Sequence, residues 1–580
     1  MATDPRVAAQ PAKWKIADVD PAAASHLADA LGISRVLAKL LVQRGFSEPQ
    51  LAERFLSPSL SDLHDPRQLP DYAAAETEIL GAVERKELIY VHGDYDADGV
   101  TSTAILHRFL TGIGANLHAH VPHRLREGYG IHPEAVDRAA EMGAKLLLTC
   151  DCGVAAHEQV ERARAHGLRV VVTDHHQPKE TLPKAEAIVN PHRNDSIYPF
   201  TDLCGAGVVL KLVAGLFRQL GHEPELIYRK FLDLAVIGTV ADMVPLVGEN
   251  RVITKFGLPA LTQSGKVGLA ALKARADMAE LPMTTTAIGF GLGPRINAVG
   301  RIDDAANALE LLITTRPERA DELAALLESQ NQRRKEDMKR VNEEAIQAVY
   351  EDGVQDDFVL IVARDHWPPG IVGLAAGRVV EHFRRPAFVM RRDPDTGELK
   401  GSGRSIEGFH LANTIGQLSS LVRGGGHAAA AGCHFSESDL AEVRRRMDEI
   451  ARLTLTEADF VPTVKIDLEV AASDVDERIM GELDRLQPYG MGNPEPMFLV
   501  RNLQLVGVKP MSRPEHVTVT FRSDSGLHRA IAFGIGERFS AVRVGATLDV
   551  VVRPEFNEWR GNREFRWNVK DFRLAAPRSD

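Results

Sequence analysis

Three short apolar runs, each ending in an acidic residue, place the strongest constraint on how this chain can fold. The runs are ELIYVHGDYDADG at 87–99, KLLLTCDCG at 145–153 and LRVVVTDHHQ at 168–177, with stretches of helical character between them. Apolar runs without alternation are typical of strands buried on both faces, as in a parallel sheet covered by helices. Because ligands of such sheets bind beyond the carboxyl ends of the strands, the acidic loops are predicted to meet at one functional edge.

Acidic and histidine residues at this edge form a candidate metal site. Alternate side chains of an extended chain point the same way, so Asp94, Asp96 and Asp98 face one side if the chain is extended at 94–98. Gly99 then permits the turn into a helix. Adjacent carboxylates repel one another unless cations bind them. The remaining members of the site follow the runs at 145–153 and 168–177 and one further apolar run, all taken as strands. These members are Asp151, Asp174-His175-His176 and Asp242.

A mixture of oxygen and imidazole ligands favours Mn²⁺, with Mg²⁺ also compatible, over metals that prefer thiolates. Each feature alone has a plainer interpretation: the aspartate-rich loop as a solvated turn, the histidine pair as structural, and Asp174 as a helix cap. Their coincidence at four predicted strand ends favours the metal site. Two divalent ions that share a carboxylate activate water and stabilise phosphoryl oxygens, so the pattern predicts hydrolysis of a phosphate ester or phosphoanhydride.

The composition excludes several other classes of protein. With 580 residues, of which 44% are hydrophobic and 26% charged, the chain is an ordinary globular protein of about three to five domains. Its 69 basic and 80 acidic residues give a net charge of −11, which argues against a uniformly basic surface but permits a local basic groove. The four cysteines include no C-x-x-C pair, and Cys150 and Cys152, beside Asp151, are expected to be buried packing residues.

Neither a targeting segment nor a membrane segment is predicted. The first residues, MATDPRVAAQPAKWK, lack the apolar core of a signal peptide, and no apolar run approaches the roughly 20 residues of a membrane helix. A low cysteine content fits a reducing compartment. We therefore expect a soluble cytoplasmic protein with no membrane partner.

The predicted fold class is α/β: a parallel-sheet lobe and a smaller α/β lobe joined by a long helix, with a C-terminal OB-like β-barrel. The stretch 318–350 keeps a helical period without glycine or proline, and HVTVTF, LHRAIAF and TLDVVVRPEF are typical of short strands. The predicted segments are an N-terminal helical accessory segment (1–75), the parallel-sheet lobe (76–315), the connecting helix (316–352), the smaller lobe (353–457) and the barrel (458–580).

Several motifs carry a resemblance to a known family. GDYDADG, TCDCG, TDHH and ADMVPL resemble, in order, the motifs of the DHH phosphoesterase superfamily. GPRINAVGR, GSGRSIEGF and GGGHAAAAG resemble its RecJ branch, the single-strand-specific exonucleases of bacteria, and the last two resemble the DHHA1 lobe of that branch. The resemblance implies a 5′→3′ single-stranded DNA exonuclease that releases mononucleotides in recombination and repair. It also implies two Mn²⁺ or Mg²⁺ ions and, as partners, a single-strand-binding protein and a helicase.

The resemblance further implies roles for the residues of the acidic edge. Asp151 matches a bridging carboxylate, and His176 matches a residue that contacts the scissile phosphate or supports the metal shell. Asp94 is a motif carboxylate with an outer role, and His92 matches a ligand of related pyrophosphatases, although a structural histidine is favoured there. The implied catalytic residues are Asp94, Asp151, His175 and His176, and the implied metal ligands are Asp96, Asp98, Asp151, His175 and Asp242.

Glycine-rich stretches, taken as loops, are predicted to hold the strand, because arginine binds phosphate in a bidentate fashion and glycine lets backbone N–H groups approach it. By resemblance, Arg301 is the first candidate for a clamp on a 5′ phosphate and Arg295 the second. Tyr129 is expected either to stack on a base or to pack on its own loop. His427 is expected before a helix whose N-terminus attracts phosphate, or whose small residues allow close packing. The predicted DNA-binding set is Arg124, Tyr129, Arg295, Arg301, Ser402, Arg404 and His427.

The end of the barrel, RPEFNEWRGNREFRWNVKDFR, interleaves aromatic and basic residues. These aromatic side chains either stack on single-stranded bases or form the barrel core. Phe565 and Trp567, two apart on one predicted strand, are expected to share a face.

Two rival functions stay open from the sequence. A small-substrate hydrolase of the same superfamily, such as a pyrophosphatase, needs neither the barrel nor the long helix. A DNA-binding scaffold with a degenerate catalytic lobe has no need for clustered carboxylates.

Overall fold

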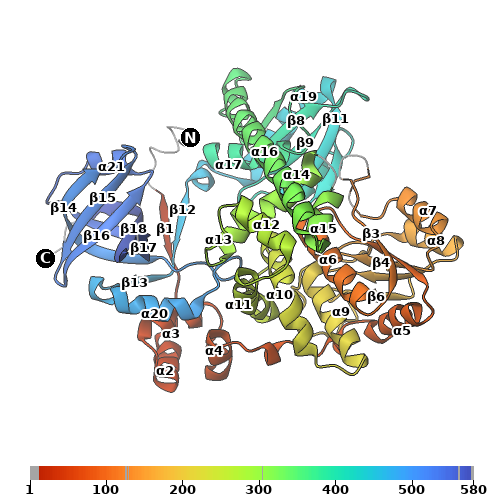
Figure 1. Cartoon of the computed structure of the whole chain (residues 1–580). Helices are drawn as coiled ribbons and strands as arrows, with labels where there is room; N and C mark the ends of the chain where they lie inside the picture. Colours follow the sequence, from red (N-terminus) through yellow and green to blue (C-terminus); the bar gives the residue numbers. More distant parts are fainter. Residues whose placement is uncertain (1–11, 124–126, 129, 303–304, 560–561, 577–580) are drawn as a thin grey trace. The chain divides into compact units, whose positions relative to one another are not determined.

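The computed structural model describes residues 12–123, 127–128, 130–302, 305–559 and 562–576. The chain divides into two compact units (Figure 1). The smaller unit contains Met1–Lys15 and Gln332–Lys465, and the larger unit contains Ile16–Asn331 and Ile466–Asp580. The predicted α/β architecture with a C-terminal barrel is confirmed, as the sheets of both units show.

A five-stranded parallel sheet forms the centre of the larger unit, with the strand order β3-β2-β4-β5-β6. The predicted apolar runs form three adjacent strands, because β2 pairs with β4 and β4 pairs with β5. Their acidic ends therefore meet at one edge, as the sequence predicts. The strands are β2 (Leu88–His92), β3 (Asn116–His120), β4 (Leu146–Cys150), β5 (Arg169–Thr173) and β6 (Ala187–Val189).

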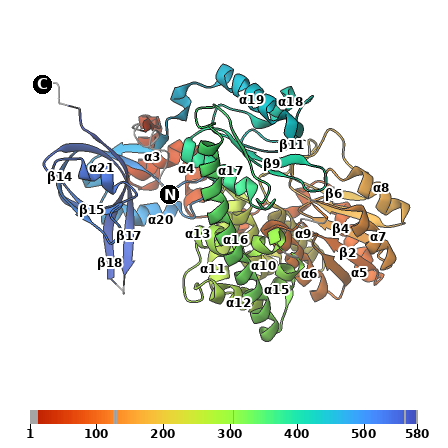
Figure 2. The same ribbon diagram turned by 90° about the horizontal axis from the view of Figure 1, so that it is seen from above.

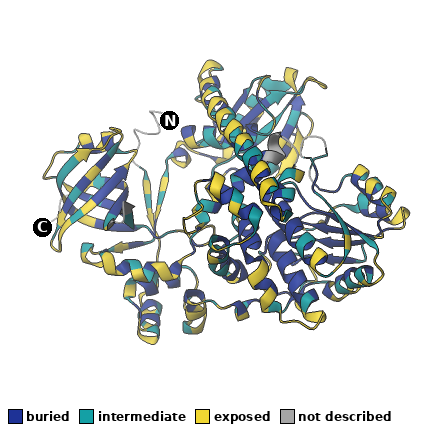
Figure 3. Cartoon of the chain, in the orientation of Figure 1, coloured by how far each residue is buried: buried dark blue, intermediate teal, exposed yellow. Residues whose placement is uncertain are grey.

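Helices cover both faces of this sheet, which explains why its strands are apolar without alternation (Figure 3). Leu146 and Leu148 face the core formed with α5, α6, α9 and α10, whereas Leu147 faces the core formed with α7 and α8. The helices of the first core are α5 (Tyr72–Glu84), α6 (Ala97–Gly112), α9 (Gly205–Gln219) and α10 (Pro224–Ala241); those of the second are α7 (Pro133–Glu141) and α8 (His157–Ala165).

Two stretches of the larger unit are helical where the sequence analysis expected otherwise. Asp242 follows α10, a helix, so the prediction of a fourth strand end is wrong. GPRINAVGR was expected to be a loop with approachable N–H groups but forms α14 (Gly293–Ile302), which continues a π-helix, η3 (Ile288–Leu292). The remaining helices are α11 (Gly248–Thr262), α12 (Val267–Arg275), α13 (Thr285–Ala287), α15 (Ala306–Ile313) and α16 (Pro317–Glu351), whose residues from Gln332 onward belong to the smaller unit.

The smaller unit contains a second five-stranded sheet with the order β10-β11-β9-β8-β7, in which β7 and β8 are parallel and the other pairs antiparallel. Two predictions fail here. GSGRS lies in the strand β9, not in a loop, and GGGHAAAAG forms the hairpin of β10 and β11, not a helix. The elements are β7 (Leu360–Ala363), α17 (Val372–Phe383), β8 (Ala387–Arg392), β9 (Glu398–Arg404), α18 (Leu411–Gln417), β10 (Arg423–Gly426), β11 (Ala430–Ser436) and α19 (Leu440–Thr454).

Close strand packing accounts for these glycines. A Cβ atom at Gly401 would lie 2.2 Å from the Val389 carbonyl oxygen, and one at Gly424 would lie 2.2 Å from the Gly432 carbonyl oxygen. The glycines of both motifs therefore permit backbones to approach, and they do not mark loops.

The C-terminal region is a closed five-stranded barrel, since β14 pairs with both β15 and β17 around the order β14-β15-β16-β18-β17. Trp567 is buried in its core, and Phe565 packs against the same core, so the two share the inward face. The elements are β13 (Leu468–Val470), α20 (Glu477–Leu486), β14 (Phe498–Pro510), β15 (His516–Ser523), β16 (Gly526–Phe533), α21 (Gly536–Ser540), β17 (Thr547–Trp559) and β18 (Asn562–Leu574).

N-terminal helices share this barrel core, which nothing in the sequence predicts (Figure 2). Leu37, Leu40 and Leu41 belong to one buried cluster with residues of α20 and the barrel strands. The helices are α2 (Pro21–Leu31), α3 (Arg35–Gln43) and α4 (Pro49–Leu56), and a strand, β1 (Lys13–Ile16), pairs with β12 (Thr463–Ile466).

Across the described residues, no helix has the length and apolar character that spanning a bilayer requires.

Candidate metal centre

The carboxyl ends of β2, β4 and β5 supply the floor of the candidate site. Asp151 follows β4 in a left-handed conformation with φ of 63°, which costs of order 1 kcal/mol for a residue other than glycine. Asp174 follows β5, accepts the N–H of Val154 at 2.9 Å and thereby ties two strand ends together. The predicted edge is confirmed as the place where these acids meet.

Asp96 and Asp98 are held by helix N-termini and are not part of an extended chain, so the predicted alternation is wrong. Asp96 caps α6 and accepts the N–H groups of Asp98 and Gly99 at 2.9 and 3.0 Å. Asp98 accepts the N–H groups of Gly205 and Ala206 at 2.6 and 2.8 Å, at the start of α9. The partial positive charge of a helix N-terminus therefore lies next to each of these two carboxylates.

Glycines let the remaining chain approach these acids. A Cβ atom at Gly205 would lie 2.7 Å from Asp151 Oδ1, and one at Gly238 would lie 2.4 Å from Asp98 Oδ1. Gly238 lies on α10, whose C-terminal residue is followed by Asp242 as the cap. Any larger residue at either glycine would displace a carboxylate.

His175 stands at the centre of three carboxylates. Its Nε2 lies 3.0 Å from Asp151 Oδ1, 3.7 Å from Asp242 Oδ2 and 3.8 Å from Asp98 Oδ2. Burial lowers the pKa of His175, which favours the neutral imidazole, a lone-pair donor. Its neighbour His176 instead bonds through Nδ1 to Asp174 Oδ1 at 2.8 Å.

Three groups of ligand atoms can each surround a metal ion, with all atoms of a group within 4.8 Å of one another. Asp151 belongs to two of the groups, as expected of a carboxylate shared between neighbouring ions, and His175 also belongs to two, although its one free ring nitrogen can bind only one ion at a time. The groups are Asp151 with His175 and His176, Asp98 with His175 and Asp242, and Asp94 with Asp96 and Asp151.

Buried atoms without partners support a cation at this place. Within the described residues, Asp94 Oδ1, Asp151 Oδ1 and His175 Nε2 are buried and make no hydrogen bond. A buried acceptor without a donor costs about 1–3 kcal/mol, and more for a charged group, so a bound cation would relieve this cost. The donors are carboxylate oxygens and imidazole nitrogens, which fit Mn²⁺ or Mg²⁺. Cys150 and Cys152 are buried as predicted and belong to none of the three groups.

The electrostatics show the same crowding of negative charge. Burial, followed by the charge of Asp96, raises the pKa of Asp94 to about 7, and burial with Asp98 raises that of Asp242 to about 8. Burial and neighbouring acids also raise the pKa of Asp96 and of Asp151. These carboxyl groups are costly to ionise together without a counter-charge.

Asp174 and His176 form a separate ion pair beside this group. Burial alone would raise the pKa of Asp174, but the hydrogen bond and charge of His176 lower it. Burial opposes protonation of His176, yet its bond to Asp174 raises its pKa to about 9. His176 is therefore a cation near neutral pH, in contrast to His175.

His92 is fully buried, and its Nε2 lies 3.1 Å from the Gly130 carbonyl oxygen. Burial lowers its pKa to about 4. His92 belongs to none of the three ligand groups found among the described residues, which fits the favoured structural interpretation.

The GPRINAVGR motif contributes to the site through a residue that the sequence analysis missed. Asn297 Oδ1 accepts the N–H of Ala97 at 2.7 Å, next to Asp96, and so holds the start of α6. Arg295 is buried, pairs with Glu328 and donates to the Gly291 carbonyl oxygen at 2.9 Å. Arg301 lies in α14 with its side chain outside the description, and Arg124 and Tyr129 lie outside the described residues.

The other predicted DNA-binding residues belong to the smaller unit. Ser402 and Arg404 lie on β9, near the first turn of α17: a Cβ atom at Gly373 would lie 3.4 Å from Ser402 Oγ and 3.3 Å from the Arg404 guanidinium. His427 is exposed in the turn of the β10–β11 hairpin, where its N–H donates to the Ala430 carbonyl oxygen at 2.8 Å.

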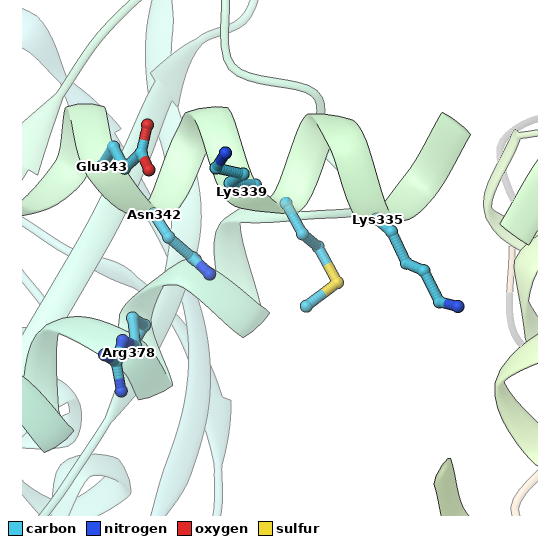
Figure 4. Close-up of a pocket in the computed structure, with 6 residues that line it drawn as sticks. Lys335, Lys339, Asn342, Glu343 and Arg378 are labelled. Atoms are coloured by element: carbon cyan, nitrogen blue, oxygen red, sulfur yellow. The ribbon is translucent and has the colours of Figure 1, made fainter. Parts of the chain in front are cut away.

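A groove between α16 and α17 adds a basic surface to the smaller unit (Figure 4). It has a volume of about 420 Å³, and it is lined by three basic side chains and one acidic side chain. Within the described residues neither of its exposed lysines has an acidic partner. The lining residues are Lys335, Met338, Lys339, Asn342, Glu343 and Arg378.

Comparisons with known proteins cover most of the chain. Family models match for the DHH family N-terminal domain over residues 88–239, the DHHA1 domain over 356–453 and the RecJ OB domain over 466–571. The single-stranded-DNA-specific exonuclease RecJ of Bacillus subtilis is 37% identical over 96% of this chain and 70% of its own length. The Escherichia coli RecJ is 34% identical over 92% of this chain and 94% of its own length.

A solved structure extends the comparison to the fold. The crystal structure of RecJ in complex with Mn²⁺ from Thermus thermophilus matches with a TM-score of 0.83 and 28% identity, over 97% of this chain and 80% of that chain.

We predict that the buried carboxyl groups of this site stabilise the metal-free protein progressively less as pH rises from about 4 to about 8. The folded state raises the carboxyl pKa values, to about 7 for Asp94 and about 8 for Asp242, so it binds these protons more tightly than the unfolded state. The stabilisation from these protonated carboxyl groups is complete below their pKa in the unfolded protein and is lost as pH rises through their pKa values in the folded protein. The raised pKa of His176 changes the stability in the same direction. Because Mn²⁺ competes with these protons, it should raise Tm more at about pH 8.5 than at about pH 6. Calorimetry that finds equal increases would contradict this account.

We predict that Asp242→Asn raises Tm by about 1–3 °C in chelator at about pH 8.5, because it removes one charge from the crowded group. The same change should reduce the rise in Tm that Mn²⁺ produces, since it weakens one of the candidate ligands. Asp29→Asn, at an exposed position on α2, is the matched control and should change neither quantity. If Asp242→Asn lowered Tm in chelator, the repulsion assigned to this group would be absent.

Proposed function

The chain belongs to the RecJ family of single-stranded-DNA-specific exonucleases, and we propose that it hydrolyses single-stranded DNA from the 5′ end to mononucleotides with two Mn²⁺ or Mg²⁺ ions. The observation that carries the proposal is the set of ligand groups that share Asp151 and His175, whose facing atoms are buried without partners. The match to RecJ in complex with Mn²⁺ supports the same metal.

We propose distinct roles for the residues of the candidate centre. The metal ligands are Asp96, Asp98, Asp151, His175 and Asp242, with Asp151 as the shared carboxylate. Asp94 completes the carboxylate group beside Asp151. Two divalent ions bound there would supply activated water and charge stabilisation for an in-line displacement at phosphorus.

His176 is suited to hold the scissile phosphate. In the metal-free protein the bond to Asp174 raises the pKa of His176 to about 9, and Asp174 orients its ring through a 2.8 Å hydrogen bond. Its positive charge therefore neutralises a phosphate oxygen, and its proton is available to the departing 3′ oxygen. Water adds to phosphorus as the bond to the 3′ oxygen breaks, so the mononucleotide keeps a 3′ hydroxyl and the shortened strand keeps a 5′ phosphate.

Ser402 and Arg404 are proposed to position the 5′ end. The guanidinium of Arg404 donates to the Gly403 carbonyl oxygen at 2.8 Å, and within the described residues no carboxylate pairs with it. Burial alone lowers its pKa, so its charge lacks compensation and is open to a phosphate. His427, Arg301, Arg124 and Tyr129 stay in the proposed DNA-binding set. Arg295 is the weakest member, since Glu328 already neutralises it.

The basic groove between α16 and α17 is proposed to bind phosphates of the strand. Lys335 and Lys339 lie one helical turn apart on α16, and Arg378, which also pairs with Glu381, lines the same groove from α17 below Asn342 (Figure 4). Such a row of cations suits a phosphate chain, whereas a pyrophosphate would need only the metal centre. This groove therefore favours a polymeric substrate over the small-substrate alternative.

The wider setting is also proposed from the family resemblance. The activity would serve recombination and repair, with a single-strand-binding protein and a helicase as partners. The segments 1–75, 76–315, 316–352, 353–457 and 458–580 are proposed as the domain organisation.

A single assay tests the proposed activity. The protein with Mn²⁺ or Mg²⁺ should release mononucleotides from single-stranded DNA, freeing a 5′ label at once while a 3′ label persists in shortening fragments, and chelator should stop the reaction. Asp151→Asn should lower the rate at least about 100-fold while binding to the strand in chelator is retained. Release of the 3′ label first would refute the direction. Turnover of pyrophosphate alone would favour the small-substrate hydrolase, and binding without cleavage would favour the scaffold.

The groove makes a separate prediction. The double substitution Lys335→Glu/Lys339→Glu should raise KM for long single strands with little change in kcat, and should reduce the slope of log affinity against log salt by about 1.4, or roughly 0.7 for each lost phosphate contact. Arg445→Glu/Arg446→Glu on α19 is the control, because it changes net charge equally at exposed side chains that already have acidic partners. An unchanged salt dependence in the lysine variant would remove the groove from the binding surface.

A further inference from the structure

A turn between α20 and the first barrel strand lies against the loop that follows Asp242. Together with the last two residues of α20, the turn spans residues 485–493, RLQPYGMGN, and it belongs with Asp242 to the larger unit. The N–H of Leu246 donates to the Met491 carbonyl oxygen at 2.7 Å, and Thr285 Oγ1 donates to the Tyr489 carbonyl oxygen at 2.8 Å. The glycine-rich sequence of this turn has no part in the function described so far.

Asp242 depends on its loop for its position. Within the described residues its carboxylate accepts no hydrogen bond, although the atom Oδ2 lies 3.7 Å from His175 Nε2. The next residue, Met243, has a φ of 61°, so the chain leaves α10 in a strained left-handed turn. Only the backbone on either side of Asp242 can therefore fix where its carboxylate points.

The turn is itself rigid, which makes it a suitable support. Asn493 is fully buried, and its side-chain amide donates to the carbonyl oxygens of Leu486 and Pro488 at 2.8 and 2.9 Å. Arg251 on α11 donates to the carbonyl oxygens of three successive residues at the end of α20 and the start of the turn, Arg485, Leu486 and Gln487.

Glycines in the turn permit its close contact with the loop. Gly492 has a φ of 71°, and a Cβ atom there would lie 2.9 Å from Pro245 Cβ. At Gly490 a Cβ atom would lie 2.5 Å from Leu246 Cδ1. A side chain at Gly492 would thus meet both unfavourable backbone geometry and a stiff proline ring.

We propose that residues 485–493 act as a positioning turn that holds Asp242 in place for metal binding. The inference rests on the proposed function only in taking Asp242 as a ligand. The turn approaches Pro245 closely and accepts the N–H of Leu246, three and four residues after Asp242, and Arg251 of α11 donates hydrogen bonds to the same turn. The segment that leads into the barrel therefore sets the affinity of the metal centre.

Gly492→Ala tests this role. Its dissociation constant for Mn²⁺, measured by calorimetric titration of the full-length protein, should rise by about 10- to 100-fold, the usual effect of disturbing residues that orient a ligand. Binding of single-stranded DNA in chelator should stay within about twofold of the unaltered protein, and raising the Mn²⁺ concentration should restore cleavage. Gly481→Ala on α20 is the matched control, because a Cβ atom there meets no atom within 4 Å.

Thr285→Val keeps the test decisive if Gly492→Ala fails to fold. It removes one hydrogen bond to the turn and should weaken Mn²⁺ binding by about 3- to 10-fold, given roughly 1 kcal/mol for a hydrogen bond. Unchanged Mn²⁺ affinity in a folded Gly492→Ala protein, or in Thr285→Val, would overturn the positioning role. If the unaltered protein bound no Mn²⁺, the metal-dependent function would fail instead.

Discussion

Repulsion among buried carboxylates is the constraint on which the rest of this structure depends. Asp94, Asp96, Asp151 and Asp242 all have raised pKa values because they are buried next to one another. A fold that only had to be stable would place such groups in water, where each would be fully ionised at little cost. Cation binding would explain the burial of these carboxylates, because bound cations would replace the repulsion among the carboxylates with attraction.

The fold meets this constraint by collecting favourable backbone dipoles around the acids. Asp96 caps α6, and Asp98 accepts two N–H groups at the start of α9, so two helix N-termini face the carboxylates. The parallel sheet supplies Asp151 and Asp174 from adjacent strand ends. His176, protonated through Asp174, adds a positive charge beside the group, while His175 stays neutral as a lone-pair donor. Neighbouring residues thus take opposite protonation states because their partners differ.

The sequence predicts the sheet and the acidic edge well, because strands buried on both faces must be continuously apolar and parallel strands must end at one edge. It fails where glycine serves tertiary packing. GSGRS and GGGHAAAAG are strands whose glycines permit close backbones, and GPRINAVGR is a helix that supplies Asn297 to the start of α6. Asp242 follows a helix, since an apolar run does not distinguish a buried strand from a buried helix. The packing of α3 into the barrel core depends on contacts between segments that are distant in the sequence, and a local sequence pattern cannot predict such contacts.

Arg251 links the N-terminal helices to the segment that leads into the barrel, close in the chain to the candidate metal centre. Its guanidinium is buried over the Phe55 ring, and its donors reach the end of α4 at Phe55 and the end of α20 at Leu486. Burial lowers its pKa to about 10, yet it stays charged, because the carbonyl groups at two helix C-termini carry partial negative charge. An apolar side chain at this position would remove the hydrogen bond that Arg251 donates to the Phe55 carbonyl oxygen in a buried interior. Since α11 carries Arg251 and begins just after the loop of Asp242, the same charged group that joins the N-terminal helices to the barrel segment also lies close in the chain to the proposed metal ligand Asp242.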